Sequence, residues 1–382
     1  MGDRRFTTAD FAATSRSVRS EGGSATKRGE QRHREGKGLD PLVDPKGFGV
    51  IRRSLFRYDG NAGKFVLTVA PAMLKETRFD TTGSMGDNVE LAFKVLPKSY
   101  NLLKEAKGAP LGRYDLQIIN SIFGDVSDDY VLCRSQAEMD DKIAEQLRLM
   151  VPEGGGGDSD EDPQYGLFGA AYLTAASIVS YGLKTYDFTV TDACGRDRLD
   201  SNTLIRVFGP EVFDKVKENG QQIKRSDLPT TKEVVKDLLK ISHAFLIQIG
   251  DRDSGGVNQF WSRIYGRDRV VVIPSVQYLP EVEAAITGLT EGVFTLKTVE
   301  DFLKKEAQIS AEEAREITRA VAGIPIGAQA ALPNFNKLPI KGDVFANKTD
   351  LWPISKGTGS KSTGGKTSSA PLAPPPGKKI WL

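Results

Sequence analysis

Histidine and cysteine are scarce in this 382-residue chain, which contains two of each. His33 lies in a polar N-terminal stretch, and His243 precedes an apolar run. This scarcity argues against zinc sites built on histidines and against most acid–base triads. Cys133 and Cys194 make no disulfide framework, and a cysteine without a partner histidine is more often structural than nucleophilic. The composition therefore gives no indication of an enzyme.

Long apolar segments are also missing. The first 30 residues lack the apolar core of a secretory signal peptide. The longest uncharged run, residues 163–183, is about long enough to span a bilayer. However, it contains three tyrosines and several other polar side chains, so a buried amphipathic helix is the better interpretation. We therefore expect a cytoplasmic protein without a membrane span.

The charge is nearly balanced overall, at +2, but it is distributed unevenly. Residues 1–38 hold nine Lys or Arg against five Asp or Glu, and residues 332–382 hold eight against two. The middle of the chain is consequently acidic. An acidic body between basic ends argues against a dedicated nucleic-acid-binding core.

Composition divides the chain into three parts. Residues 1–40 are polar and rich in Arg, Ser, Gly and Glu, so we expect a disordered basic arm. Residues 41–330 have the apolar content of a folded domain with helical additions at its end. Residues 331–382 form a flexible tail rich in Pro, Gly, Ser and Lys, and residues 370–376 favour polyproline structure.

The tail ends in a bulky apolar cluster at the tip of a flexible tether, formed by Ile380, Trp381 and Leu382. Aromatic residues are typical anchors in the binding pockets of partner proteins. The cluster is therefore a candidate partner-binding motif. Docking onto its own domain is an equally reasonable interpretation.

Apolar runs alternate with amphipathic segments along the central part of the chain. This alternation is typical of a doubly wound, mostly parallel α/β sheet flanked by helices. We expect strands at residues 73–80, 116–123, 130–133, 186–192, 244–250 and 269–274, with a further strand or extended lead-in at 64–70. We expect helices at residues 87–105, 136–150, 165–181, 204–219, 231–241, 258–265, 279–290, 299–306 and 311–321.

The first of these strands delivers a loop with three oxygen donors at alternate positions, Asp80, Thr82 and Ser84. Hard oxygen donors on a tight loop suit Mg²⁺ or Mn²⁺. Further aspartates follow other strands at positions 125, 192 and 251. Ligands gather at the carboxyl ends of the strands in such a sheet, so this recurrence supports a site there.

Three other interpretations of the loop deserve comparison. In the simplest, Asp80 or Thr82 only caps the following helix. A haloacid-dehalogenase phosphotransferase would need a second carboxylate at the position of Thr82. An aspartic protease would need an Asp-Thr-Gly triplet, which Thr81 interrupts. The metal interpretation therefore depends on ligands from elsewhere in the chain.

The loop Asp-Thr-Thr-Gly-Ser-Met, residues 80–85, resembles the metal-ion-dependent adhesion site of von Willebrand factor A domains, in a spelling similar to that of bacterial members. That family adds an Asp at the end of its fourth core strand, and Thr191-Asp192 matches this position. The resemblance covers roughly residues 64–300. It implies metal ligation by Asp80, Thr82, Ser84 and Asp192.

The remaining part of the family pattern departs from its usual form. Four glycines, residues 154–157, are followed by an acidic stretch where the family usually has Thr. This stretch is similar to the acidic loop of integrin β-type domains, which implies that Glu161 faces the metal and Asp158 lines the site. A solvated flexible loop is the alternative. Asp87 could hold a second metal, but an acid in the first helical turn has a simpler role with the helix dipole.

The resemblance implies a divalent-metal-dependent protein-binding module rather than an enzyme. Mg²⁺ or Mn²⁺ would hold an Asp or Glu carboxylate of the partner. Bacterial intracellular relatives work as adaptors in complexes, some beside AAA+ ATPases, so such a partner is implied as well. Two alternatives remain: an Mg²⁺-dependent phosphoryl-transfer or hydrolytic enzyme, and a structural scaffold with a degenerate metal site.

Overall fold

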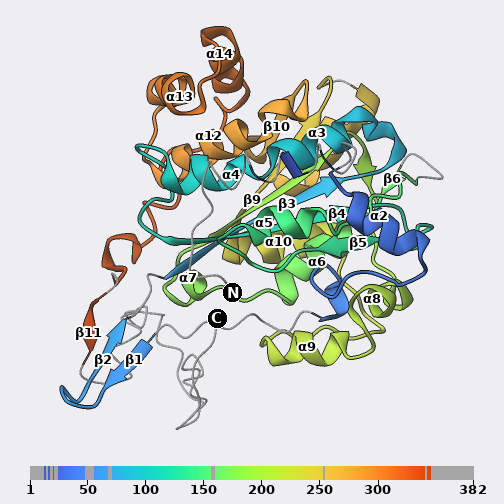
Figure 1. Cartoon of the computed structure of the whole chain (residues 1–382), viewed down its shortest axis with the longest axis horizontal. Coiled ribbons are helices and arrows are strands. Elements are labelled where there is room, and N and C mark those ends of the chain that lie inside the picture. The colour runs from blue at the N-terminus through green and yellow to red at the C-terminus, as the bar shows by residue number, and fades with distance from the viewer. Residues whose placement is uncertain are drawn as a thin grey trace.

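A six-stranded sheet forms the centre of the computed structural model, which describes residues 13, 16, 17, 20, 25–47, 56–67, 71–155, 160–252, 254–339 and 342–345 (Figure 1). The spatial order of its strands is β10-β9-β7-β3-β4-β5, and every neighbouring pair is parallel except β4 with β5. The doubly wound, mostly parallel sheet expected from the sequence is confirmed. The strands are β3 (Ala72–Asp80), β4 (Asp115–Phe123), β5 (Leu132–Arg134), β7 (Thr185–Thr191), β9 (Ser242–Ile249) and β10 (Val270–Ile273).

The connectivity of the sheet determines where a ligand site can form. Numbered along the chain, these six strands have the order 3-2-1-4-5-6, so the direction of winding reverses between β3 and β7. Ligands in open α/β sheets bind outside the carboxyl ends of the strands at this switch point. Asp80 ends β3, and Asp192 directly follows β7.

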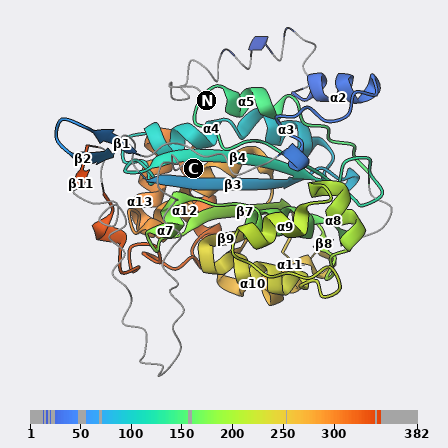
Figure 2. The ribbon, with the colours of Figure 1, turned by 90° about the horizontal axis from the view of Figure 1, so that it is seen from below.

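Helices cover both faces of the sheet (Figure 2). Two separate apolar clusters result, one on each face. Phe245 and Ile247 of β9 belong to one cluster and Leu246 to the other, because successive strand residues point to opposite faces. Residues in the first cluster come from helices α3 (Asp87–Val95), α5 (Lys142–Leu147), α12 (Leu279–Glu291), α13 (Leu296–Phe302) and α14 (Ala311–Ala320). Residues in the second come from α6 (Pro163–Tyr172), α8 (Ser201–Phe208), α9 (Val212–Glu218), α10 (Thr231–Ile241) and α11 (Val257–Tyr265).

Two small sheets lie outside the central one. β2 (Lys64–Leu67) pairs with β1 (Phe56–Asp59) and with β11 (Val344–Phe345), all antiparallel. The segment expected as a lead-in at 64–70 therefore belongs to a separate sheet, near the amino end of β3 (Figure 1). β6 (Asp160–Glu161) pairs in parallel with β8 (Cys194–Gly195) at the opposite end of the molecule.

The helix expected at 204–219 divides into α8 and α9 around Gly209, whose φ is 89°. Two other predicted helices are shorter than expected because side chains and backbone make tertiary bonds there. The segment 165–181 divides into α6 and α7 (Ser177–Ser180), where the Thr174 hydroxyl donates to the Gly169 carbonyl at 2.8 Å and accepts from Arg134 at 2.7 Å. The segment 136–150 contains only α5, because Glu138 exchanges both backbone hydrogen bonds with a residue of β4.

The N-terminal arm also contains structure that the sequence does not predict. Residues 27–34, placed in the expected disordered arm, form helix α2 (Lys27–Arg34). The helix expected at 87–105 consists of α3 and a further short helix, α4 (Lys98–Tyr100), which continues its path. Among the helices described, none combines the length and the apolar character that a bilayer crossing requires. The predicted partner-binding residues Ile380, Trp381 and Leu382 lie outside the described residues.

Candidate metal site

Asp80 is placed by the central strand of the sheet and is fully buried. The backbone N–H and the hydroxyl of Thr82 both donate to Asp80 Oδ1, at 2.9 and 2.7 Å. The loop then makes one turn of 3-10 helix, Gly83–Met85, and enters α3 at Gly86, whose φ of 48° favours glycine. The loop is therefore folded around the carboxylate rather than around the end of α3.

Thr191 and Asp192, the second part of the predicted site, contact this loop across the switch point between β3 and β7. The Ser84 hydroxyl donates to Asp192 Oδ1 at 2.8 Å, although 108 residues separate them. The hydroxyl of Thr191 donates to the other oxygen of Asp80, Oδ2, at 2.5 Å. Thr82 and Ser84 are themselves 3.4 Å apart, Oγ1 to Oγ. The structure thus brings Asp80, Thr82, Ser84 and Asp192 into one network.

Glu161 reaches the same network from the acidic loop. It lies on β6, beside the chain that follows Asp192, and only 4% of its surface is exposed. Its Oε2 has no hydrogen-bond partner among the described residues. Burial and the negative charge of Asp80 raise the pKa of Glu161 to about 8, against a weaker opposing effect of the Thr82 hydroxyl. Asp158, the other predicted residue of this loop, lies outside the described residues.

The surroundings of Asp80 also disfavour its charged form. Burial raises its pKa to about 6, and the nearby Asp192 adds to this effect, while hydrogen bonds from Thr191 and Thr82 oppose it. Within the described part of the chain, no Lys or Arg makes an ion pair with Asp80, Glu161 or Asp192. Three carboxylates therefore converge without a positive charge.

These donors fit a hard divalent cation. Carboxylate and hydroxyl oxygens are the ligands that Mg²⁺ and Mn²⁺ accept. A bound cation would give the unpartnered Oε2 of Glu161 a ligand and would offset the repulsion among the three carboxylates. Of the predicted site residues, five therefore lie where a single ion could contact them, directly or through water.

A surrounding group of residues positions the acidic loop, and most of it was not identified from the sequence. Arg196 forms ion pairs with Asp125, at 3.0 Å, and with Asp162, at 3.2 Å. Asp162 also accepts from the Val126 N–H at 2.9 Å. The arginine thus fixes the residue after Glu161 to the end of β4. Asp125, one of the aspartates noted at strand ends, therefore supports the acidic loop through Arg196.

One glycine of the loop is explained by a close approach. The Gly155 carbonyl accepts from the Gly83 N–H at 3.1 Å, which joins the acidic loop to the first metal loop. A Cβ at Gly155 would lie 1.7 Å from the Asp128 carboxylate, so a larger residue there would require that carboxylate to move. Two other acids stay outside the network: Asp87 and Asp251 are exposed.

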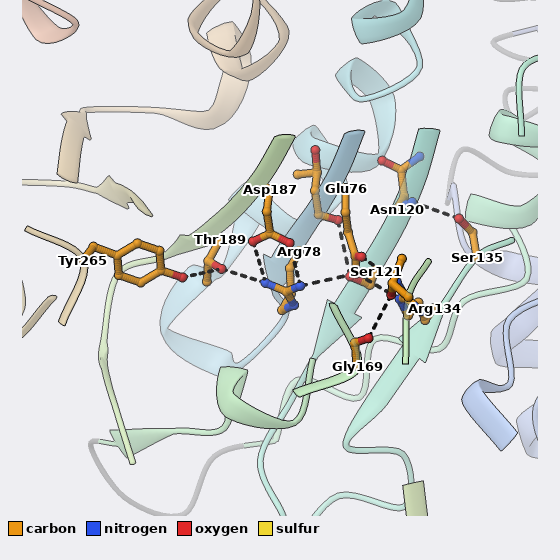
Figure 3. Close-up of polar contacts among 12 residues, drawn as sticks. Glu76, Arg78, Asn120, Ser121, Arg134, Ser135, Gly169, Asp187, Thr189 and Tyr265 are labelled. Atoms are coloured by element: carbon orange, nitrogen blue, oxygen red, sulfur yellow. Dashed lines mark hydrogen bonds and ion pairs between the residues drawn. The ribbon is translucent and has the colours of Figure 1, made fainter. Parts of the chain in front are cut away.

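A buried network of charges lies behind the site in the sheet (Figure 3). Arg78, two residues before Asp80, contacts Asp187 of β7 through both guanidinium nitrogens, at 3.2 and 3.0 Å. Glu76 accepts from Arg134 of β5 in the same two-pronged manner, at 3.0 and 2.6 Å, and lies 3.4 Å from Arg78. These two acids and two arginines balance in charge, and the arginines hold the pKa of Glu76 below its usual value although burial opposes this.

The helix above this network must have a small residue. A Cβ at Gly166 of α6 would lie 2.4 Å from Cδ and Nε of Arg78. Arg78 also donates to Thr189 at 2.8 Å, and the hydroxyl of Thr189 contacts that of Tyr265 at 3.1 Å. The network therefore ties β3, β5, β7 and two helices together directly beneath the metal loop.

Comparison with known proteins gives little further information. No family model matches the chain, and no curated protein matches it either. Among solved structures, proximal thread matrix protein 1 from the mussel byssus is 12% identical, with a TM-score of 0.36, over 56% of this chain and 47% of that one. A structure of that protein with a zinc-occupied metal-ion-dependent adhesion motif is 14% identical, over the same shares, with a TM-score of 0.34.

The pilus adhesin SpaC from Lactobacillus rhamnosus GG, in its open conformation, is 12% identical. The match covers 65% of this chain and 34% of the adhesin, with a TM-score of 0.39. The chain thus matches less than half the length of each of these proteins.

Proposed function

We propose that this protein is a divalent-metal-dependent protein-binding module. Mg²⁺ or Mn²⁺ would be held by Asp80, Thr82, Ser84 and Asp192, with Glu161 beside it. One observation carries the proposal: carboxylates from three distant segments converge at the switch point of the sheet, and no Lys or Arg among the described residues forms an ion pair with them. The resemblance of the loop to a metal-ion-dependent adhesion site agrees with this placement.

The bound cation would supply the positive charge that attracts an Asp or Glu carboxylate of a partner. Mg²⁺ keeps several exchangeable waters, so a partner carboxylate could replace one of them. Thr82 and Ser84 are neutral ligands and would leave the ion part of its positive charge. Hydrogen bonds from Thr82 and Thr191 hold Asp80 in one orientation before any ligand arrives. Little rearrangement of the first loop would then accompany binding.

A basic hollow near the site favours an acidic partner. Arg252, Arg263 and Arg267 line a hollow of about 530 Å³ beside α11. α11 contacts the loop after Asp192 through Trp261, whose indole N–H donates to the Ala193 carbonyl at 2.8 Å. A partner that offered one carboxylate to the metal could place further acids against these arginines.

The chemistry of nearby side chains supports binding over catalysis. Burial raises the pKa of the Cys194 thiol, and the Arg263 charge only partly offsets this, so the thiolate is disfavoured. Burial lowers the pKa of His243 to about 4, and this histidine lies at the amino end of β9, away from the metal edge. Neither group offers an activated nucleophile or base at the site.

The wider role that we propose is that of an adaptor in a bacterial intracellular complex, as the family resemblance implies, with an AAA+ ATPase as one class of partner. Within that proposal the terminal cluster of Ile380, Trp381 and Leu382 provides a second, apolar contact with the partner. A flexible link between two contacts raises their combined avidity without any new interaction.

Calorimetric titration with Mg²⁺ and Mn²⁺ tests the metal site. The wild-type protein should bind one ion, and the double variant Asp80→Ala/Asp192→Ala should lose that binding. Asp87→Ala is the matched control, because Asp87 is an exposed acid on the adjacent helix. At a metal concentration of 100 Kd, binding should stabilise the wild type by about 2.7 kcal/mol and leave the double variant unchanged. Equal affinity in all three proteins would refute the ligand assignment.

A peptide array carrying single Asp or Glu residues tests the binding function. Capture should require Mg²⁺ or Mn²⁺, should be abolished by EDTA, and should be lost in the double variant. Capture that is unchanged in EDTA would identify a scaffold instead. Turnover of a phosphoester that disappears in the double variant would identify a metal-dependent enzyme.

A further inference from the structure

A second group of potential metal ligands lies away from the site described above. His33, Asp129 and Glu153 each offer one ligand atom, and these atoms all lie within 4.8 Å of one another. His33 belongs to α2, Asp129 to the connection between β4 and β5, and Glu153 to the segment just before the glycines. The Nε2 of His33 is 3.0 Å from Oδ2 of Asp129.

The backbone and neighbouring side chains hold two of these groups in place. Glu153 accepts hydrogen bonds from the backbone N–H groups of Asp129, at 3.0 Å, and Tyr130, at 2.7 Å. The ring of His33 packs edge-on against that of Tyr130, with centroids 5.1 Å apart. The imidazole and the Glu153 carboxylate are therefore oriented by contacts independent of any ion.

The helix that carries the histidine is itself fixed to the body of the protein. The Gly29 N–H donates to the Arg148 carbonyl at 3.0 Å. A Cβ at Gly29 would lie 2.1 Å from the Met150 carbonyl oxygen, so the backbone of α2 is in direct contact with the end of α5 and the residues that follow it. His33 thus reaches Asp129 from a defined position and not from a mobile arm.

We propose that His33, Asp129 and Glu153 form a second metal site, which binds zinc or a similar transition-metal ion. Zinc accepts imidazole nitrogen and carboxylate oxygen at about 2.0–2.2 Å in a tetrahedral arrangement, which places two ligand atoms roughly 3.3 Å apart. The 3.0 Å between Nε2 and Oδ2 is close to this separation. A single histidine suffices here because carboxylates supply the other two ligands.

The two proposed sites differ in the metal ions that their ligands favour. An imidazole nitrogen favours Zn²⁺ and its neighbours in the first transition row, whereas sites made only of oxygen ligands favour Mg²⁺ and Mn²⁺. A hollow of about 270 Å³, lined in part by Lys37, Asp129 and Tyr130, adjoins the cluster. It gives the ion a route of entry and leaves room for a water as the fourth ligand.

The second site has a consequence for the first. Glu153 lies two residues before Gly155, whose carbonyl is bonded to the N–H of Gly83 in the metal loop. An ion held by Glu153 would therefore fix the start of the acidic loop and, at the same time, clamp α2 to the body. The site itself does not depend on the proposed binding function.

Absorption spectroscopy with Co²⁺, a probe for zinc sites, tests this proposal on the full-length, untagged protein in excess Mg²⁺. The wild type should bind one Co²⁺ with the intense visible bands of a four-coordinate ion, and Zn²⁺ should displace it. His33→Gln and Asp129→Asn should each weaken Zn²⁺ binding by at least about 10-fold, since even outer-shell changes have effects of that size. Asp141→Asn, which changes an exposed acid at the start of α5, is the control.

Comparison of the variants shows which of the two proposed metal sites gives the Co²⁺ bands. Asp80→Ala/Asp192→Ala should keep the Co²⁺ bands, whereas His33→Gln should lose them. Circular dichroism without metal should be the same for the wild type, His33→Gln and Asp129→Asn, because Asp129 is exposed and His33 is only partly buried. Wild-type protein that shows no saturable binding of Zn²⁺, or a His33→Gln variant that binds it as tightly, would overturn the proposal. Loss of the bands in the double variant alone would place the ion at the first site and would also overturn it.

Discussion

Removal of Asp187 should destabilise the protein far more than removal of a surface ion-pair partner. Asp187 and Arg78 are both almost completely inaccessible to solvent and make two hydrogen bonds with each other. Deleting one partner of a buried pair leaves an uncompensated charge, which costs about 3–5 kcal/mol. In Asp187→Ala, Arg78 would still have Glu76 as an ion-pair partner at 3.4 Å. We therefore expect Asp187→Ala to lower the free energy of unfolding by about 3 kcal/mol, near the lower end of this range.

Urea denaturation followed by the fluorescence of the buried Trp261 measures this loss. With an m-value of about 3 kcal/mol/M, the midpoint should fall by about 1 M. The control is Lys94→Ala, which removes an exposed i,i+4 partner of Glu90 and should cost less than about 1 kcal/mol.

A double substitution separates the cost of an unpaired charge from the cost of lost packing. Arg78→Met with Asp187→Leu removes both charges and leaves the pair of Glu76 with Arg134 intact. The double variant should be more stable than Asp187→Leu alone, because an apolar pair of similar volume can replace a buried ion pair. If Asp187→Ala costs no more than Lys94→Ala, the reasoning about this network is wrong.

Three further predictions concern packing, pH and the tail. Gly166→Ala should cost about 1–3 kcal/mol, measured by the same denaturation, because its Cβ would overlap Arg78, whereas Gly323→Ala, with open space around it, should be nearly neutral. Glu291 accepts hydrogen bonds from two tyrosine hydroxyls, and burial raises its pKa to about 7. The Glu291 carboxyl therefore keeps its proton to a higher pH in the folded state than in the unfolded state. The free energy of unfolding should then fall by up to about 3 kcal/mol as the pH rises from 4.5 to 7. In thermal melts, Glu291→Gln should reduce this dependence on pH. Deletion of residues 370–382 should leave the melting temperature and Mg²⁺ affinity unchanged but weaken complex formation with the partner protein; a lower melting temperature with full complex formation would show that the tail docks on its own domain.

The strands of the sheet could be predicted from sequence because they are short segments between loops and are buried on both faces. The expected strand 73–80 corresponds to β3 (Ala72–Asp80), and 186–192 corresponds to β7 (Thr185–Thr191). Their order in the chain places Asp80 and Asp192 at one edge of the sheet. The metal loop was therefore accessible to sequence reasoning, since its residues follow directly from the ends of predicted strands.

Other features depend on contacts that leave no pattern in the sequence. Helix α2 docks through the backbone of Gly29, so its polar composition gives no sign of burial. Glu76 and Arg78 would be assigned to solvent by their charge, and only the pairing across β5 and β7 explains their burial. Arg196 lies in a loop, and its role depends on two acids from different segments that meet only in the fold.

The place of β11 limits how the tail can cooperate with the metal edge. The last described residue, Phe345, pairs with β2 near the amino end of β3, while the metal loop lies at the carboxyl end of that strand. Nine strand residues at about 3.3 Å each separate the two points by about 30 Å. The 37 residues after Phe345 would span about 30–36 Å as a flexible coil. In the proposal that these residues form a flexible tether, its length would match this distance, which is the condition for the highest effective concentration, so shortening the tail by half should reduce avidity more than lengthening it by half.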